Sequence, residues 1–330
     1  MRRYFSLAAL SFYSAIWIFL LFVLQNFVGE RTGFTALLTY FPAHIWGVLP
    51  AIFGVFCLCK RQFSGAIWNG AALAFWFFAI LGFQIPAPNW GENPDAFSVR
   101  VVSYNVLGGR ADAAQIAREI AAQKPDIVCL QESQNGFGER VAAHLSGWNC
   151  QSRGDVSTLS RFPILRSKSH FLRGTRWTMD ITFQTPNGAL RVVNTHVSMA
   201  YKNQENIARE PLRRVRQIVR TQGRAAWARV EQIAPIRAAT LGNEMPTVLC
   251  GDFNTPPRGL FYRALSAEFD DAFAQKGFGV GATYPASLPL LRIDYVWLKN
   301  GARAKSAFVA HASGSDHLPL VCDVSWPQNS

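Results

Sequence analysis

The stretch TVLCGDFN (247–254) is an apolar run that ends in two polar side chains, Asp252 and Asn254. Short apolar runs bounded in this way predict buried β-strands. Five further segments show the same pattern: VRVVSYNVL (99–107), DIVCLQE (126–132), LRVVNTHV (190–197), RIDYVWL (292–298) and LPLVCDV (318–324). We therefore expect the chain from residue 99 onward to contain several buried strands.

Helix and hairpin signals lie between these strands. DAAQIAREIAAQ (112–123) carries Ile116 and Ile120 four residues apart, which indicates an amphipathic helix. ILRSKSHFLRGTRWTMDITFQT (164–185) is typical of a hairpin pair around Gly174. Strands and helices in this order indicate α/β layers around a mixed or largely antiparallel sheet core.

Polar residues gather at the ends of the predicted strands. The set is Asn105, Glu132, His196, Asp252, Asn254, Asp294, Asp316 and His317. One carboxylate at a strand end is usually a cap or turn residue, but eight residues drawn only from these types are hard to explain as turns. Oxygen ligands suit Mg²⁺ or Mn²⁺, whereas a zinc site would show clustered His or Cys. We therefore expect a site for a hard divalent cation.

Seven short motifs resemble, in order, those of the endonuclease/exonuclease/phosphatase superfamily. They are SYNVLGG (103–109), IVCLQES (127–133), SRFPI (160–164), VVNTHVS (192–198), VLCGDFNTPP (248–257), RIDYVWL (292–298) and SGSDHLPLV (313–321). That superfamily includes deoxyribonucleases, apurinic/apyrimidinic endonucleases, inositol-phosphate phosphatases and bacterial sphingomyelinases. The resemblance covers about residues 99–325. It implies a four-layer α/β sandwich, in which two packed mixed or antiparallel sheets are flanked by helices.

The resemblance also implies roles for the metal-site residues. Glu132 is similar to the metal-binding glutamate, and Asn105 to the asparagine that helps to hold the metal or the phosphate. Asp316 matches a second metal-site carboxylate. The cofactor implied is Mg²⁺ or Mn²⁺.

The catalytic roles follow from the same comparison of motifs. Asp252 resembles the aspartate that orients or deprotonates the attacking water, and Asn254 the residue that steadies the phosphate. His317 resembles the histidine that contacts the phosphoryl oxygens, with Asp294 orienting it. His196 matches a histidine that acts as an acid or phosphate contact, and its alternative is an ordinary buried strand-end histidine.

Phosphate-ester chemistry accounts for these residue types independently. A phosphate ester is anionic, so a site must neutralise oxygen charge and align a water with the leaving oxygen. A divalent cation on Glu132 would supply the neutralisation, and Asp252 would take the proton of the water. Pairing Asp294 with His317 would favour the cationic histidine.

The first third of the chain has the composition of a membrane region. Residues 1–98 carry only eight of the 54 charged residues, and they contain three uncharged runs of 26, 28 and 30 residues. Each run exceeds the ~20 residues that cross a bilayer as a helix. Three transmembrane helices are therefore predicted, with two as the alternative because Pro42 and Pro50 weaken the second run. This composition excludes a disordered chain and a wholly cytosolic enzyme.

Basic residues predict the orientation and the domain limits. Arg2 and Arg3 precede the first run, and Lys60 and Arg61 separate the second from the third. The positive-inside rule places both pairs in the cytoplasm, so the later domain lies outside. We expect a three-helix transmembrane region at 1–86, a linker at 87–98 and a catalytic domain at 99–326, in a bacterial inner or plasma membrane.

A basic helical segment lies between His196 and Gly251, where the family usually has a shorter helix. Arg213, Arg216 and Arg220 would form one stripe on a helix. This stripe is a candidate for binding nucleic-acid phosphates or an anionic lipid surface. The alternative is a solvated helix face.

We therefore predict a membrane-anchored, metal-dependent phosphoesterase that hydrolyses a phosphodiester or phosphomonoester. The substrate is expected to be a lipid headgroup, a nucleic acid or a small phosphoester, and the motifs do not choose among them. The partners expected are this substrate and the bilayer, with no obligate protein partner evident. The alternatives are an extracytoplasmic nuclease acting on DNA or RNA and a catalytically inactive membrane scaffold or sensor. The six cysteines show no metal or redox spacing and are expected to be free thiols.

Overall fold

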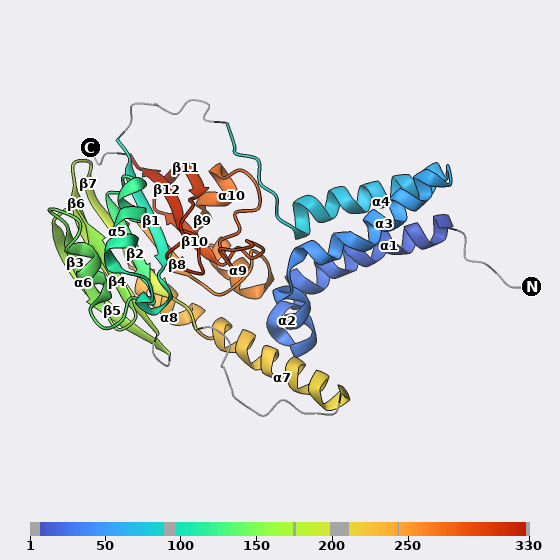
Figure 1. The fold of residues 1–330 in the computed structure, drawn as a ribbon, viewed down its shortest axis with the longest axis horizontal. Helices are drawn as coiled ribbons and strands as arrows, with labels where there is room; N and C mark the ends of the chain where they lie inside the picture. Colours follow the sequence, from blue (N-terminus) through green and yellow to red (C-terminus); the bar gives the residue numbers. More distant parts are fainter. Residues whose placement is uncertain (1–6, 89–96, 174–175, 199–210, 243, 328–330) are drawn as a thin grey trace, which may run out of the picture.

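Two parts make up the molecule, a bundle of apolar helices and an α/β sandwich (Figure 1). The computed structural model describes residues 7–88, 97–173, 176–198, 211–242 and 244–327. In Figure 1 the helices α1, α3 and α4 lie side by side at one end of the molecule, and both sheets lie at the other.

Two six-stranded mixed sheets form the sandwich. The first has the order β11 (Arg303–Val309), β12 (Leu320–Ser325), β1 (Val99–Asn105), β2 (Ile127–Gln131), β4 (Val156–Ser160) and β3 (Asn149–Arg153). The second has the order β5 (Ile164–Arg173), β6 (Arg176–Thr185), β7 (Gly188–His196), β8 (Thr247–Asp252), β10 (Asp294–Lys299) and β9 (Asp270–Asp271). The β1–β2 and β7–β8 pairs are parallel, and the other pairs are antiparallel. All the predicted strands are confirmed.

Helices cover both outer faces of the paired sheets. α5 (Ala113–Ala122) and α6 (Phe137–Ala142) bury their apolar side chains against the first sheet. α8 (Ile233–Thr240) and α9 (Gly259–Ser266) do the same against the second sheet, and α10 (Ala272–Lys276) packs beside β11. The core between the sheets contains Cys129, Cys250 and Cys322 as free thiols. The four-layer α/β sandwich is confirmed.

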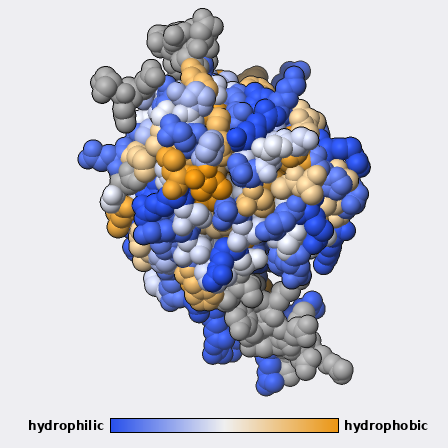
Figure 2. All heavy atoms as spheres, turned by 90° about the vertical axis from the view of Figure 1, so that its left-hand side faces the viewer, coloured by the Kyte–Doolittle hydropathy of each residue, from blue (hydrophilic) through white to orange (hydrophobic). Residues whose placement is uncertain are grey.

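Two N-terminal helices are long and apolar enough to cross a membrane. The first runs over Leu7–Arg31 and includes α1 (Leu7–Val23), and the second runs over Phe63–Ile80 and includes α4 (Phe63–Phe75). Large apolar side chains on these helices are exposed, among them Ile67 at 70%. By contrast, Figure 2 shows mainly hydrophilic residues on the face of the sandwich that is turned away from these helices.

The second uncharged run does not form one continuous straight helix. It forms α2 (Gly33–Tyr40) and then a helix over Ala43–Cys59 that contains α3 (Val48–Cys59), with a bend of 88° between them. The break falls at Phe41, whose ψ of 143° is not helical. Pro42 explains it, because a proline disfavours the helical conformation of the residue before it. Only the part after Pro42 is directed along α1 and α4 (Figure 1).

The N-terminal helical region packs directly on the sandwich, in addition to the covalent linker that the sequence predicts. Glu30 is buried, and its carboxylate accepts a hydrogen bond of 2.7 Å from the backbone N–H of Leu260. Arg258 is also buried, and its guanidinium donates to the carbonyl oxygens of Thr39, Phe41 and Ile80. The sandwich is therefore held against the ends of the N-terminal helices. The middle of the linker, residues 89–96, lies outside the described residues.

The predicted basic helix is present as α7 (Pro211–Val230). α7 packs against α2 of the N-terminal helical region (Figure 1).

Candidate active site

Strand pairing brings the predicted polar residues to one edge of the sandwich. In the first sheet Asn105 is the last residue of β1, and Glu132 directly follows β2. In the second sheet His196 and Asp252 end the parallel strands β7 and β8 and lie side by side in register. The carboxyl ends of parallel strands meet at one edge of a sheet, which is where α/β folds assemble sites.

Asp252 lies at the centre of this edge and is fully buried. Its Oδ2 accepts a hydrogen bond of 2.9 Å from the side-chain amide of Asn105, and its Oδ1 accepts one of 2.8 Å from the backbone N–H of Asn254. Asn254 has a φ of +50°, and its side chain donates to the carbonyl of Val197 at 2.9 Å. Both carboxylate oxygens of Asp252 are therefore fixed in position.

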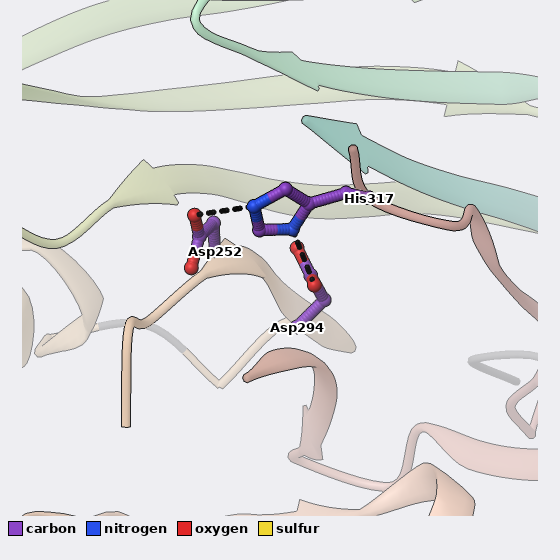
Figure 3. A group of neighbouring side chains, drawn as sticks. All are labelled: Asp252, Asp294 and His317. Carbon is purple, nitrogen blue, oxygen red and sulfur yellow. Dashed lines mark hydrogen bonds and ion pairs between the residues drawn. The ribbon is translucent and has the colours of Figure 1, made fainter. Parts of the chain in front are cut away.

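His317 lies between two carboxylates (Figure 3). Its Nδ1 is 2.9 Å from Oδ2 of Asp294, and its Nε2 is 3.8 Å from Oδ2 of Asp252. The hydroxyl of Thr283 donates to the same Asp294 oxygen at 2.5 Å. The ring of Tyr284 packs on the histidine with centroids 4.8 Å apart. Asp294 thus sets the orientation of His317.

The charges around His317 favour its protonated form. Burial by itself lowers the pKa of the imidazole, because it penalises the charged state. The negative charges of Asp294 and Asp252 outweigh burial and raise the pKa to about 9. His317 is therefore cationic at neutral pH and can stabilise anionic oxygen.

His196 belongs to a second Asp–His pair that the sequence does not reveal. Its Nδ1 lies 2.8 Å from Oδ2 of Asp155, and its Nε2 lies 3.6 Å from Oδ2 of Asp252. This Nε2 is buried and has no hydrogen-bond partner among the described residues. Arg176 donates to Asp155 at 2.8 Å. Asp155 follows Gly154 in a turn, and Arg176 is the first residue of β6. Neither residue stands in a motif that would mark it in the sequence as a functional residue.

Glu132 and Asp316 face a cleft beside these histidines. Both residues line the cleft, and the carboxylate of Glu132 lies 3.9 Å from His196 Nε2 and 3.7 Å from an Arg176 nitrogen. Glu132 has a φ of +53°, a strained backbone conformation for a residue with a long side chain. Such strain is concentrated at functional sites, where the surrounding structure enforces it.

The three arginines of the predicted stripe line one hollow along α7, and two of them also line the cleft that contains Glu132. Arg216 and Arg220 line the cleft that contains Glu132. Arg213 does not line this cleft and lies in a neighbouring hollow along α7. Of the three arginines, two therefore line the same cleft as Glu132.

Comparison with known proteins identifies the family. The profile described as "Endonuclease/Exonuclease/phosphatase family" matches residues 102–317, which is most of the sandwich. The chain belongs to the endonuclease/exonuclease/phosphatase family. Members of this family are hydrolases that act on phosphate esters, and they generally depend on a divalent metal. A comparison with curated protein sequences gave no significant match.

Solved structures of endonuclease/exonuclease/phosphatase proteins share this fold. A family protein from Bacteroides thetaiotaomicron is 17% identical, with a TM-score of 0.56 over 71% of this chain and 100% of the other. The mannosyl-6-phosphatase Bt3783 of the same organism is also 17% identical, with a TM-score of 0.55 over 69% of this chain and 100% of the other. D. rerio TDP2, solved with a single-strand DNA product, is 15% identical, with a TM-score of 0.52 over 69% and 99% of the two chains.

Two groups of side chains are candidates for the metal site. One is the buried set of Asp252, Asp294 and His317, and the other is Glu132 with Asp316 at the cleft. Asp252, Asp294 and His317 offer ligand atoms within 4.8 Å of one another. However, Asp294 and His317 already bind each other through Oδ2 and Nδ1, and a cation there would have to displace a protonated imidazole. Glu132 fits better, because its carboxylate faces the cleft and accepts no hydrogen bond among the described residues.

Asn105 anchors Asp252 through its side chain. Its amide oxygen accepts a hydrogen bond of 3.0 Å from the backbone N–H of Leu107, and its amide nitrogen holds Asp252. Both polar atoms of the side chain are thus engaged in positioning the catalytic edge.

Proposed function

We propose that this chain is a membrane-anchored, divalent-metal-dependent phosphoesterase that hydrolyses a phosphate ester by attack of water. One observation supports the proposal most strongly. A fixed carboxylate, Asp252, lies within 4 Å of the Nε2 atoms of both His196 and His317, and each histidine is held by its own aspartate. This arrangement supplies one proton acceptor and two groups that can bind anionic oxygen.

In this mechanism Asp252 orients the attacking water and accepts its proton. The water oxygen forms a bond to phosphorus, the ester bond from phosphorus to the leaving oxygen breaks, and that oxygen takes up a proton. His317, cationic at neutral pH, stabilises the negative charge that develops on the phosphoryl oxygens. His196 directs Nε2, which has no hydrogen-bond partner in the described part of the chain, to the same space and is placed as a second contact or as the proton donor. Asn254 holds the loop that follows Asp252.

Glu132 and Asp316 are the side chains that would hold Mg²⁺ or Mn²⁺, since both carboxylates line the cleft. When bound, such a cation neutralises phosphate charge and lowers the pKa of water. Arg176 lies close to Glu132 and Asp155, and it limits the excess of negative charge where the substrate phosphate must enter.

The arrangement of the helices supports three membrane crossings. Arg258 on the sandwich contacts the end of α2 and the end of the second long helix, at Ile80. The Lys60–Arg61 turn between α3 and α4 lies at the opposite end of the bundle, beside the start of α1 (Figure 1). The positive-inside rule assigns that end to the cytoplasm. We therefore infer an integral protein of a bacterial inner or plasma membrane with an extracytoplasmic catalytic domain.

The full chain, purified in phosphatidylcholine nanodiscs, provides the test. With Mg²⁺ it should hydrolyse bis(p-nitrophenyl) phosphate or p-nitrophenyl phosphate. Asp252→Asn and His317→Ala should each lower kcat with little change in KM, because both groups act on the transition state. The double variant should lose less than the product of the two single losses. A parent protein that cleaves neither ester with Mg²⁺ or Mn²⁺ would favour the inactive scaffold instead.

A further inference from the structure

A large cleft leads from the catalytic edge toward the membrane helices. Its volume is about 1400 Å³. Glu132, Asp316 and Tyr284 line one part of it, and Arg31 and Gly33 of the membrane region line another. Binding sites for drug-sized ligands typically measure ~300–1,000 Å³. The cleft therefore has room for much more than a phosphate group.

The membrane region builds the far end of this cleft. Gly33 begins α2 directly after Leu7–Arg31, a helix able to span a bilayer. α2 and α7 approach so closely that a Cβ on Gly33 would lie 2.4 Å from the carbonyl oxygen of Val219, and one on Gly223 would lie 2.6 Å from Gly33 Cα. Glycine is needed at both positions because any side chain would clash. The cleft thus reaches the level at which the first membrane helix ends.

The wall that α7 contributes combines apolar and basic side chains. Val215 and Trp227 line the cleft and are 58% and 47% exposed. Arg216 and Arg220 line the same wall, and the cleft as a whole has seven arginines against four acidic residues. Helices that lie at a bilayer surface show this combination, because their apolar side chains contact acyl chains while arginines bind anionic headgroups.

The cleft is preformed, because the two parts that line it are locked together. Glu30 accepts a hydrogen bond from Leu260, and Arg229 of α7 stacks over the ring of Tyr40 with 4.4 Å from guanidinium carbon to centroid. Tyr40 in turn contacts the hydroxyl of Thr255, the residue after Asn254. The membrane region therefore reaches the loop that holds Asp252.

We propose that this cleft binds an amphiphilic phosphate ester taken from the membrane. The phosphate lies at Glu132 and Asp316, where the cleft meets the edge that contains the buried Asp252 and His317, and the apolar chain runs along α7 toward Gly33. The proposal rests on the phosphoesterase activity proposed above and specifies its substrate class. A nucleic acid fits less well, because the cleft runs toward the bilayer and Val215 and Val219 offer no contact to a charged backbone.

A homologous series of substrates tests this proposal. Methyl, butyl and hexyl p-nitrophenyl phosphodiesters share one leaving group and differ only in the apolar chain. The full chain would be assayed in phosphatidylcholine nanodiscs with Mg²⁺. A fully buried methylene strengthens binding by about fourfold. We therefore expect kcat/KM to rise on the order of tenfold or more from methyl to hexyl.

Two variants locate the apolar contact. Val215→Gln should flatten the rise with chain length and leave the methyl ester within about twofold of the parent. Leu165→Gln is the matched control, because Leu165 is 56% exposed on β5 and does not line the cleft. It should leave the whole series unchanged. The methyl ester also reports folding, since a misfolded variant would lose that activity too.

Each remaining outcome contradicts the proposal in a distinct way. Equal kcat/KM for all three esters in the parent would overturn the membrane amphiphile and leave the phosphoesterase intact. The same flat series together with faster, strongly salt-dependent cleavage of a single-stranded oligonucleotide would assign the cleft to nucleic acid. No cleavage of any ester with Mg²⁺ or Mn²⁺ would contradict the proposed function itself, and the inference with it.

Discussion

Asp155 Oδ2 lies 2.8 Å from Nδ1 of His196, and this contact gives the catalytic edge a second Asp–His pair. The first pair, Asp294 with His317, has a nearly equal separation of 2.9 Å. Both histidines direct Nε2 toward the same oxygen of Asp252, at 3.6 and 3.8 Å. Two other carboxylates therefore fix the two rings whose Nε2 atoms point toward Asp252.

Asp155→Asn should lower kcat by about tenfold or more while KM stays within about twofold. The substitution keeps the size of the side chain but removes the charge that holds the His196 ring, so the effect falls on the transition state. Asp323→Asn is the control, because Asp323 pairs with Arg100 outside the cleft. Steady-state kinetics on bis(p-nitrophenyl) phosphate measure both variants. Parent-like kcat in Asp155→Asn would show that His196 needs no such partner.

The alkaline limit of activity should depend on Asp294. Burial lowers the pKa of His317, but the charges of Asp294 and Asp252 raise it to about 9, so the cation is lost as pH rises through that value. Asp294→Asn removes the larger of these two charge effects and should move the alkaline limb of kcat to lower pH. Rates measured from about pH 6 to about pH 10 would reveal the shift. If the alkaline limb of the kcat profile stayed at the same pH in Asp294→Asn, the loss of activity at high pH would belong to a group other than His317.

The sequence predicts one half of the site much better than the other. Asp252, Asn254, Asp294 and His317 stand in short motifs at the ends of apolar strands, and periodicity together with strand ends locates them. Asp155 and Arg176 act only because β4 and β6 bring them beside His196, a tertiary juxtaposition that local sequence does not encode.

In the N-terminal helical region, too, the sequence predicts the elements but not the contacts between them. Composition predicts its apolar runs, but the break before Pro42 and the packing of α2 on α7 depend on contacts between distant segments. A buried Glu30 within an otherwise apolar region is visible in the sequence, yet only the fold shows that Leu260 is its partner.

Arg258 should be important for the stability of the full chain. Its guanidinium is buried and donates to three carbonyl oxygens of the N-terminal helical region. Arg258→Met removes these donors and leaves the carbonyls unsatisfied, so the Tm should fall by about 5 °C or more. Arg263→Gln, in the helix α9 that follows Arg258, is the matched control, because its bond to the Asn26 carbonyl is exposed and should contribute little. Thermal unfolding in nanodiscs compares the two variants. Equal Tm values would show that the Arg258 contacts do not stabilise the packing of the sandwich on the N-terminal helices.

Reporter fusions should place the catalytic domain outside the cytoplasm. Alkaline phosphatase folds only outside, so a fusion after Ser330 should be active and a fusion after Arg61 should be inactive. This result follows from three crossings with the Lys60–Arg61 turn inside. The reverse pattern would mean that the helix over Ala43–Cys59 does not span.

The rate of bis(p-nitrophenyl) phosphate hydrolysis by the parent and by Glu132→Gln, measured against Mg²⁺ concentration, tests the central claim most directly. Glu132→Gln keeps the shape of the side chain but removes the charge that would hold the cation. Glu231→Gln is the control, because Glu231 lines the same cleft but pairs with Arg173. We predict that the parent is inactive in EDTA, that Glu132→Gln loses about 10²-fold or more and requires more Mg²⁺, and that Glu231→Gln resembles the parent. Full activity of the parent in EDTA, or an unchanged Mg²⁺ dependence in Glu132→Gln, would contradict the account.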